Sequence, residues 1–134
     1  MNKLKEFIEH HDVFTRPVDV ETIHNAECAL NITFTPEYKC WLETAGVLSY
    51  ESSEVFGLGV SDTAWLNILR ATAELRSEFP LYPANAVPLM DAEDGQFYLY
   101  DHEVGNIVRW SSVAGVMERL KLPLEEFLLE QISL

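Results

Sequence analysis

The sequence has few basic residues, since nine Lys and Arg stand against 22 Asp and Glu and give a formal net charge of −13. A surface that negative repels phosphate groups, which argues against binding to nucleic acid and against binding to an anionic membrane. A basic protein partner is favoured instead, because opposite potentials accelerate encounter. The charge therefore favours a protein partner over nucleic acid or a membrane.

Cysteine is also scarce, with only Cys28 and Cys40. Two cysteines do not make a disulfide scaffold, and their spacing is not that of a zinc site. We therefore expect two reduced thiols that pack as small apolar groups.

Long apolar runs are absent. No segment approaches the ~20 residues that cross a bilayer, and the charged, amphipathic stretch Met1–Glu9 lacks the apolar core of a signal peptide. These observations predict a cytoplasmic protein. Its 134 residues, 48% of them hydrophobic, fit a single domain over residues 1–134.

Familiar catalytic motifs are missing too. The chain contains no P-loop, no GxGxxG and no GxSxG. The histidines lack ligand spacing and are expected at the surface: His10, His11, His24 and His102. We therefore expect no enzyme, no metal site and no cofactor.

Helix signals are clear. Asp19 is a typical N-cap, Thr35 followed by Pro36 and Glu37 marks a helix start, and Gly46 suits a left-handed C-cap. The hydrophobic spacing predicts helices over residues 2–11, 19–30, 36–45, 62–78 and 123–132. In the fourth helix, Ser61 or Asp62 would be the cap and Trp65 would lie on the apolar face.

Strand signals lie mostly in the second half, at residues 55–60, 86–90, 96–101 and 106–110. The order of elements predicts an α+β fold with N-terminal helices, a central and mostly antiparallel sheet, and a C-terminal helix.

Glu27 stands on an apolar stripe between Ile23 and Leu30, and a buried carboxylate needs hydrogen-bond donors. We expect it to bind backbone amides of a nearby loop; the alternative is a boundary position with the carboxylate in water.

The stretch from Met90 to Gly105 contains five acids, two tyrosines and no Lys or Arg. A calcium loop beginning at Asp91 fails, because its sixth place is Gln96 and its twelfth is His102. A catalytic pair of Asp91 and Asp101 remains an alternative, although carboxylates in solvated turns keep ordinary properties. The simplest interpretation is two tight turns, with Gly95 and Gly105 at positions of positive φ.

The strand between these turns has Tyr98 and Tyr100 on one face and Phe97 and Leu99 on the other. If one face is free, aromatic side chains rimmed by acids form a protein interface; if helices cover both faces, the tyrosines belong to the core. The predicted partner-binding residues are Glu51, Glu54, Asp91, Glu93, Asp94, Tyr98, Tyr100, Asp101 and Glu103.

Several segments together resemble the SUKH superfamily, which includes bacterial toxin-immunity proteins and fungal regulators of cell-wall synthesis. They are Ile23–Leu30, Thr35–Leu42 ending at Gly46, Phe56–Gly59, Val87–Pro88, Asp94–Gly95, Gly105 and Leu124–Leu128. The resemblance covers about residues 19–131 and makes 19–132 the family-like core, with 1–18 as an extra helix and link. Eight residues in this region are expected to stabilise the fold rather than to contact a partner: Glu27, Pro36, Tyr38, Trp41, Gly46, Gly57, Gly95 and Gly105.

Two departures leave the subgroup open. Gly46 is followed by Val47 rather than by further glycines, and the Asp94–Gly95 turn lacks a second glycine. The resemblance implies a non-catalytic cytoplasmic protein that neutralises a toxin, often a nuclease. We expect a monomer or a weak dimer. An alternative is a scaffold or regulatory module with a host protein partner.

Overall fold

The computed structural model describes residues 1–133 and contains five helices and two antiparallel sheets. The helices are α1 (Asn2–His10), α2 (Val20–Leu30), α3 (Pro36–Thr44), α4 (Ile68–Glu78) and α5 (Leu124–Ile132). The small sheet has the order β1 (Phe14–Thr15), β2 (Leu48–Tyr50), β3 (Ser53–Val55), and the large one the order β4 (Ala86–Glu93), β5 (Gln96–Asp101), β6 (Asn106–Ser111), β7 (Gly115–Leu120). The predicted α+β class is confirmed.

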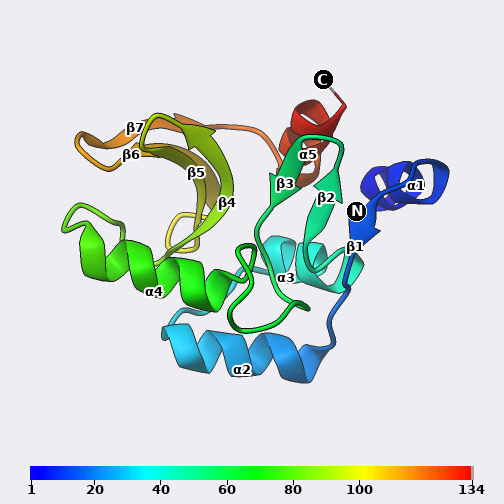
Figure 1. Cartoon of the computed structure of the whole chain (residues 1–134), viewed down its shortest axis with the longest axis horizontal. Helices are drawn as coiled ribbons and strands as arrows, with labels where there is room; N and C mark the ends of the chain where they lie inside the picture. Colours follow the sequence, from blue (N-terminus) through cyan, green and yellow to red (C-terminus); the bar gives the residue numbers. More distant parts are fainter. Residues whose placement is uncertain (134) are drawn as a thin grey trace.

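The large sheet is a meander in which each strand pairs with the next one in the chain. It curves over α4 on one side of the molecule, while the small sheet, α5 and α1 lie on the other side (Figure 1). Both faces of β5, in the middle of the large sheet, pack against other parts of the protein. Tyr100 belongs to the main core with Tyr38 and Trp41, whereas Leu99 and Trp110 belong to a second cluster packed against α4.

The fourth helix begins later than predicted, at Ile68 rather than near residue 62. Asn67 is its cap, with a side chain that accepts from the N–H of Leu69 at 2.7 Å and is itself buried. The amide of Asn67 donates to the carbonyls of Val60 and Ser61. These side-chain bonds hold residues 61–67 in turns that the hydrophobic pattern does not reveal.

Three strands were missed and one was misplaced. The strand predicted over residues 55–60 is instead β3 at Ser53–Val55, so the prediction and the structure share only Val55. The missed strands β1 and β2 are too short to give a pattern. The edge strand β7 has mostly exposed side chains, so it shows no alternation of apolar and polar residues.

Backbone segments cross closely where Gly46 and Gly59 meet Arg16 and where Gly57 meets Gly46. A Cβ at Gly46 or Gly59 would overlap the carbonyl of Arg16, and one at Gly57 would overlap the carbonyl of Gly46. Two hydrogen bonds fix the crossing, from Arg16 N–H to the Ala45 carbonyl at 2.7 Å and from Leu58 N–H to the Gly46 carbonyl at 2.9 Å. Glycine is required here by the close approach of backbone to backbone.

Two expectations about side chains are wrong. Cys28 and Cys40 are free but exposed, so they do not pack in the core. His102 is buried rather than at the surface. Its Nδ1 accepts from the N–H of Thr35 at 3.1 Å, and its ring stacks on Phe34.

Candidate protein-binding groove

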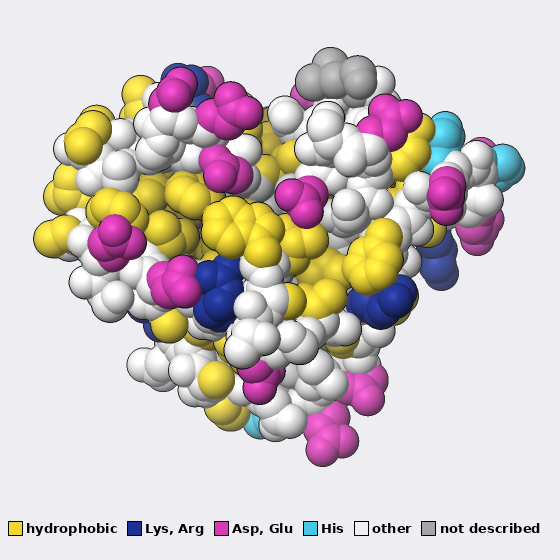
Figure 2. Space-filling view, in the orientation of Figure 1, with side chains coloured by type: hydrophobic (Ala, Val, Ile, Leu, Met, Phe, Trp, Pro, Cys, Tyr) yellow, Lys and Arg dark blue, Asp and Glu magenta, His cyan; other side chains and the backbone are white. Residues whose placement is uncertain are grey.

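A groove between the two sheets brings together three of the predicted interface acids, Glu54, Asp91 and Glu93. Its volume is about 360 Å³, and its lining is Ser52, Ser53, Glu54, Phe56, Trp65, Met90, Asp91, Glu93 and Gln131. On the face drawn in Figure 2, apolar side chains gather between the sheets and acidic side chains border them. The groove combines an apolar floor with a carboxylate rim, which is the composition of many protein interfaces.

The predicted partner-binding acids in the groove, and those next to it in the sequence, are carried on tight turns and irregular strand ends. Glu51 and Asp94 do not line the groove but adjoin residues that do. Glu51 (φ +53) in the β2–β3 turn, and Glu93 (φ +66) and Asp94 (φ +55) in the β4–β5 turn, adopt left-handed backbone conformations. The β4–β5 pairing shifts register between Asp91 and Glu93, where the Glu93 N–H donates to Asp91 Oδ1 at 2.7 Å. Strand irregularities and left-handed non-glycine residues often occur where side chains are aimed at a partner.

Trp65 is the large apolar residue exposed in the groove, with 51% of its surface accessible. The guanidinium of Arg70 holds its loop by donating to the carbonyls of Ala64 and Trp65. The indole packs against Phe56 at 5.4 Å and lies under Arg70 at 5.3 Å. Because its loop is fixed, Trp65 would lose little conformational entropy on binding, as expected of a residue that dominates binding energy.

No Lys, Arg or His lines the groove, so its three carboxylates face solvent without a lining counter-charge. Such a surface attracts cationic side chains and raises the rate of encounter with a basic partner. Within residues 1–133, no group of three or more His, Cys, Asp or Glu is arranged to hold a metal ion. The chemistry available to the groove is therefore recognition of cationic and apolar groups.

The predicted partner-binding acids do not form one continuous rim. Asp101 and Glu103 lie at the opposite end of β5 from the groove, and a strand of this length spans roughly 17–20 Å. Asp101 is also buried and paired with Arg119 at 3.1 Å. It is therefore not available to a partner.

The two tyrosines proposed for the interface face the helices. Tyr100 is buried, donates to Glu37 Oε1 at 2.7 Å and accepts from the Thr35 hydroxyl. Tyr98 is half-buried and packs edge-on against Phe127 of α5. The aromatic residue that the groove exposes is Trp65, which the sequence pattern assigned to a buried helix face. No sequence signal distinguishes it, because its exposure depends on the Asn67 and Arg70 hydrogen bonds.

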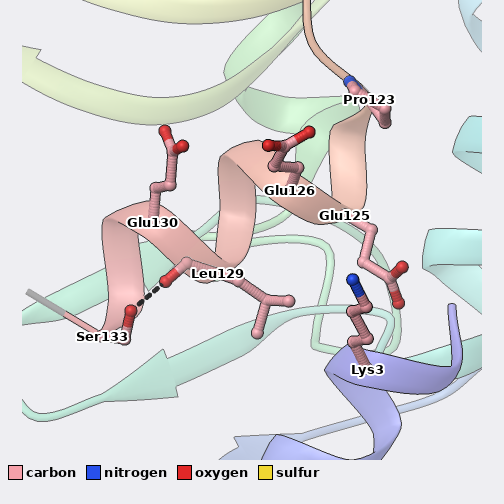
Figure 3. A pocket seen from close by; sticks show the side chains of 7 residues that line it. All are labelled: Lys3, Pro123, Glu125, Glu126, Leu129, Glu130 and Ser133. Carbon is pink, nitrogen blue, oxygen red and sulfur yellow. Dashed lines mark hydrogen bonds between the residues drawn. The ribbon is translucent and has the colours of Figure 1, made fainter.

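A second hollow, of about 470 Å³, lies between α1 and α5 and includes Lys3, Glu125, Glu126 and Glu130 (Figure 3). Glu125 has a structural role there, since its Oε2 accepts from the N–H of Leu4 at 3.1 Å. That bond attaches α1 to α5. The hollow exposes no large aromatic residue, unlike the groove that contains Trp65.

The strongly perturbed titratable groups belong to the core rather than to the groove. Burial raises the pKa of Tyr38, Tyr82 and Tyr100 above the usual range, and burial lowers the pKa of His102 to about 3. Their neutral forms are the packed forms, so these shifts describe core packing.

Comparisons with known proteins agree with the fold. A crystal structure of a protein from Pseudomonas syringae pv. tomato is similar over 90% of each chain, with a TM-score of 0.69 and 18% identity. No curated protein matches the sequence. Across residues 1–133, the structure contains no helix long and apolar enough to cross a membrane.

A family model described as SMI1-KNR4 cell-wall, SUKH_5, matches residues 1–133 and so takes in α1, which the motif resemblance left outside. A match over nearly the whole chain shows family membership. The chain therefore belongs to the SUKH_5 family, within the SUKH superfamily.

Proposed function

We propose that this protein is a cytoplasmic immunity protein that binds and neutralises a basic toxin domain, for which a nuclease is one candidate. The observation that carries the proposal is the groove in which Glu54, Asp91 and Glu93 surround the exposed Trp65. Membership of a family related to toxin-immunity proteins supports it. The protein acts by binding and has no catalytic role.

The mechanism is occlusion. The carboxylates of the groove take the place of substrate phosphates at the cationic surface of the toxin, and the net charge of −13 accelerates encounter. Trp65 then buries its exposed face against the toxin and slows dissociation. Salt should therefore change the association rate strongly and the dissociation rate little.

A second candidate is a scaffold or regulatory module that binds a host protein, which the description of the family as SMI1-KNR4 cell-wall favours. The same groove would serve, because a fold does not fix a partner. The two candidates differ in the identity of the ligand rather than in the surface used.

The test is binding kinetics with the protein encoded by the gene adjacent to this one, measured at low and high salt. The groove variant carries Glu54→Gln, Asp91→Asn and Glu93→Gln. A matched control carries Glu9→Gln, Glu43→Gln and Glu78→Gln, three exposed acids that do not line the groove. Both variants remove three negative charges, so they have the same net charge.

We expect the groove variant to associate more slowly than the control and to show a weaker salt dependence. Trp65→Ala should increase the dissociation rate. Equal association rates for the two triple variants would place the binding surface elsewhere. Absence of binding to the adjacent gene product, with binding of a host protein at the groove that the groove variant loses, would support the scaffold instead.

A further inference from the structure

Cys28 and His24 form a thiol–imidazole pair on the exposed side of α2. Residues four apart on a helix lie on the same face, and here Cys28 Sγ is 3.6 Å from His24 Nε2. The His24 side chain is 71% exposed, and the thiol is free and exposed. The thiol is therefore accessible to solution and adjacent to a group that can accept its proton.

A carboxylate lies behind the imidazole. His24 Nδ1 is 4.0 Å from Glu27 Oε1, and the other oxygen of Glu27 accepts from the Phe34 N–H at 2.8 Å and faces Lys39 Nζ at 3.7 Å. Glu27 is fixed by these contacts, with only 13% of its side chain exposed. At 4.0 Å the carboxylate is too far to hydrogen-bond the imidazole, so it is a nearby fixed negative charge. The contact that can assist the sulfur is the one between the Cys28 thiol and the His24 imidazole.

The pair opens into a hollow of about 410 Å³ between the end of α2 and α3, lined by His24, Glu27, Cys28, Asn31, Ile32, Thr33 and Lys39. Cys28 lies in the last turn of α2, whose carbonyl dipoles disfavour an anion, so the imidazole of His24 is the feature that could assist this thiol. Cys40 provides an internal comparison. It is also exposed, but its neighbour is the Met1 amine at 4.0 Å, and no imidazole bonds to it within the described residues.

We propose that Cys28 is a modification site that undergoes thiol–disulfide exchange with a low-molecular-weight disulfide, assisted by His24. His24 accepts the thiol proton, and the Cys28 sulfur attacks one sulfur of the disulfide. The disulfide bond breaks, a mixed disulfide forms on Cys28, and the released small thiolate takes the proton from His24. One disulfide and one thiol are consumed, and one mixed disulfide and one small thiol are formed.

The test uses the full chain carrying Cys40→Ser, so that Cys28 is the single thiol, and oxidised glutathione near neutral pH with mass spectrometry as the readout. The comparison chain carries Cys28→Ser and retains Cys40. We expect Cys28 to form the mixed disulfide several-fold faster in the native chain than in the same chain unfolded in urea. Equal rates in the folded and unfolded chains would overturn the proposal.

His24→Gln separates assistance by the imidazole from simple exposure, since Gln keeps a hydrogen-bonding side chain that cannot be protonated. In the Cys40→Ser chain this change should slow the reaction roughly fivefold or more. In the Cys28→Ser chain it should leave the rate of Cys40 unchanged. A Cys28 rate that His24→Gln does not alter, in a variant with an unchanged melting temperature, would also overturn the proposal.

Discussion

Glu37 and Leu124 are 87 residues apart in the chain, yet Glu37 Oε2 accepts a hydrogen bond from the Leu124 N–H at 3.0 Å. The other oxygen of the same carboxylate accepts from the hydroxyl of Tyr100 at 2.7 Å. A single side chain on α3 therefore supplies a hydrogen-bond acceptor to the first turn of α5 and holds β5 beside it.

Replacing Glu37 should destabilise the fold. Glu37→Ala leaves the Tyr100 hydroxyl and the Leu124 N–H without this acceptor, which should lower the free energy of unfolding by about 1–3 kcal/mol. The measurement is urea unfolding. Glu43→Ala, an exposed acid on the same helix, is the control and should change stability by less than about 0.5 kcal/mol. Similar losses from both variants would contradict this role of Glu37.

Glu27 should also contribute to stability, through the Phe34 N–H that it binds, which is the loop amide interaction expected from the sequence. Glu27→Ala should cost on the order of 1–3 kcal/mol, measured by thermal or urea unfolding. Glu27→Gln keeps an acceptor oxygen and should lose much less. An unchanged melting temperature in Glu27→Ala would mean that water replaces the carboxylate without cost.

The acidic β4–β5 turn should not bind calcium tightly. Asp91 Oδ1 is engaged with the Glu93 N–H, and Asp91, Glu93 and Asp94 are spread over a bulge and a tight turn rather than around one point. Calorimetric titration with calcium after chelator treatment should show no saturable site in the micromolar range. A micromolar site that is lost in an Asp91→Asn, Glu93→Gln, Asp94→Asn variant would overturn the interpretation of this segment as a turn.

Stability should fall on mild acidification because of His102. Burial lowers the pKa of His102 in the folded state to about 3, below the ordinary value of 6.5. The unfolded chain binds the proton first, so this contribution is present above about pH 6.5 and is lost progressively as the pH falls toward 3. Between about pH 7 and pH 5 the loss should be about 2 kcal/mol.

The check is urea unfolding at both pH values for the parent and for His102→Asn. Asn retains an acceptor for the Thr35 N–H but does not titrate. The variant should be less stable at neutral pH and should respond less to acid. An identical pH response in both proteins would assign the effect to other groups.

The sequence is informative where short-range chemistry decides the structure. The Asp19 and Thr35 caps, the Pro36 start and the left-handed Asn31 at the end of α2 are local features, and α2 and α3 lie where they were predicted. The strands β4, β5 and β6 of the large sheet were predicted for the same reason, because their apolar segments are separated by short turns that contain glycine.

Side-chain hydrogen bonds and packing between elements account for what was missed. Trp65 is exposed because Asn67 and Arg70 bind carbonyls of its loop, and no local pattern predicts those bonds. The acidic rim divides into two parts because the turns lie at opposite ends of β5, and Asp101 is buried because Arg119 arrives from β7. The assignment of Tyr98 and Tyr100 required knowing that α3 and α5 cover that face of the sheet.

The glycine crossing has a consequence for how this chain can diverge. At Gly46, Gly57 and Gly59 backbone packs on backbone, so even alanine would force apart segments from three regions of the sequence. The acids of the groove instead stand on exposed turns and strand ends, where substitution changes the surface charge and leaves the core intact. Point mutations at the groove can therefore give the protein a new binding preference, while almost no substitution is tolerated at the three glycines of the crossing.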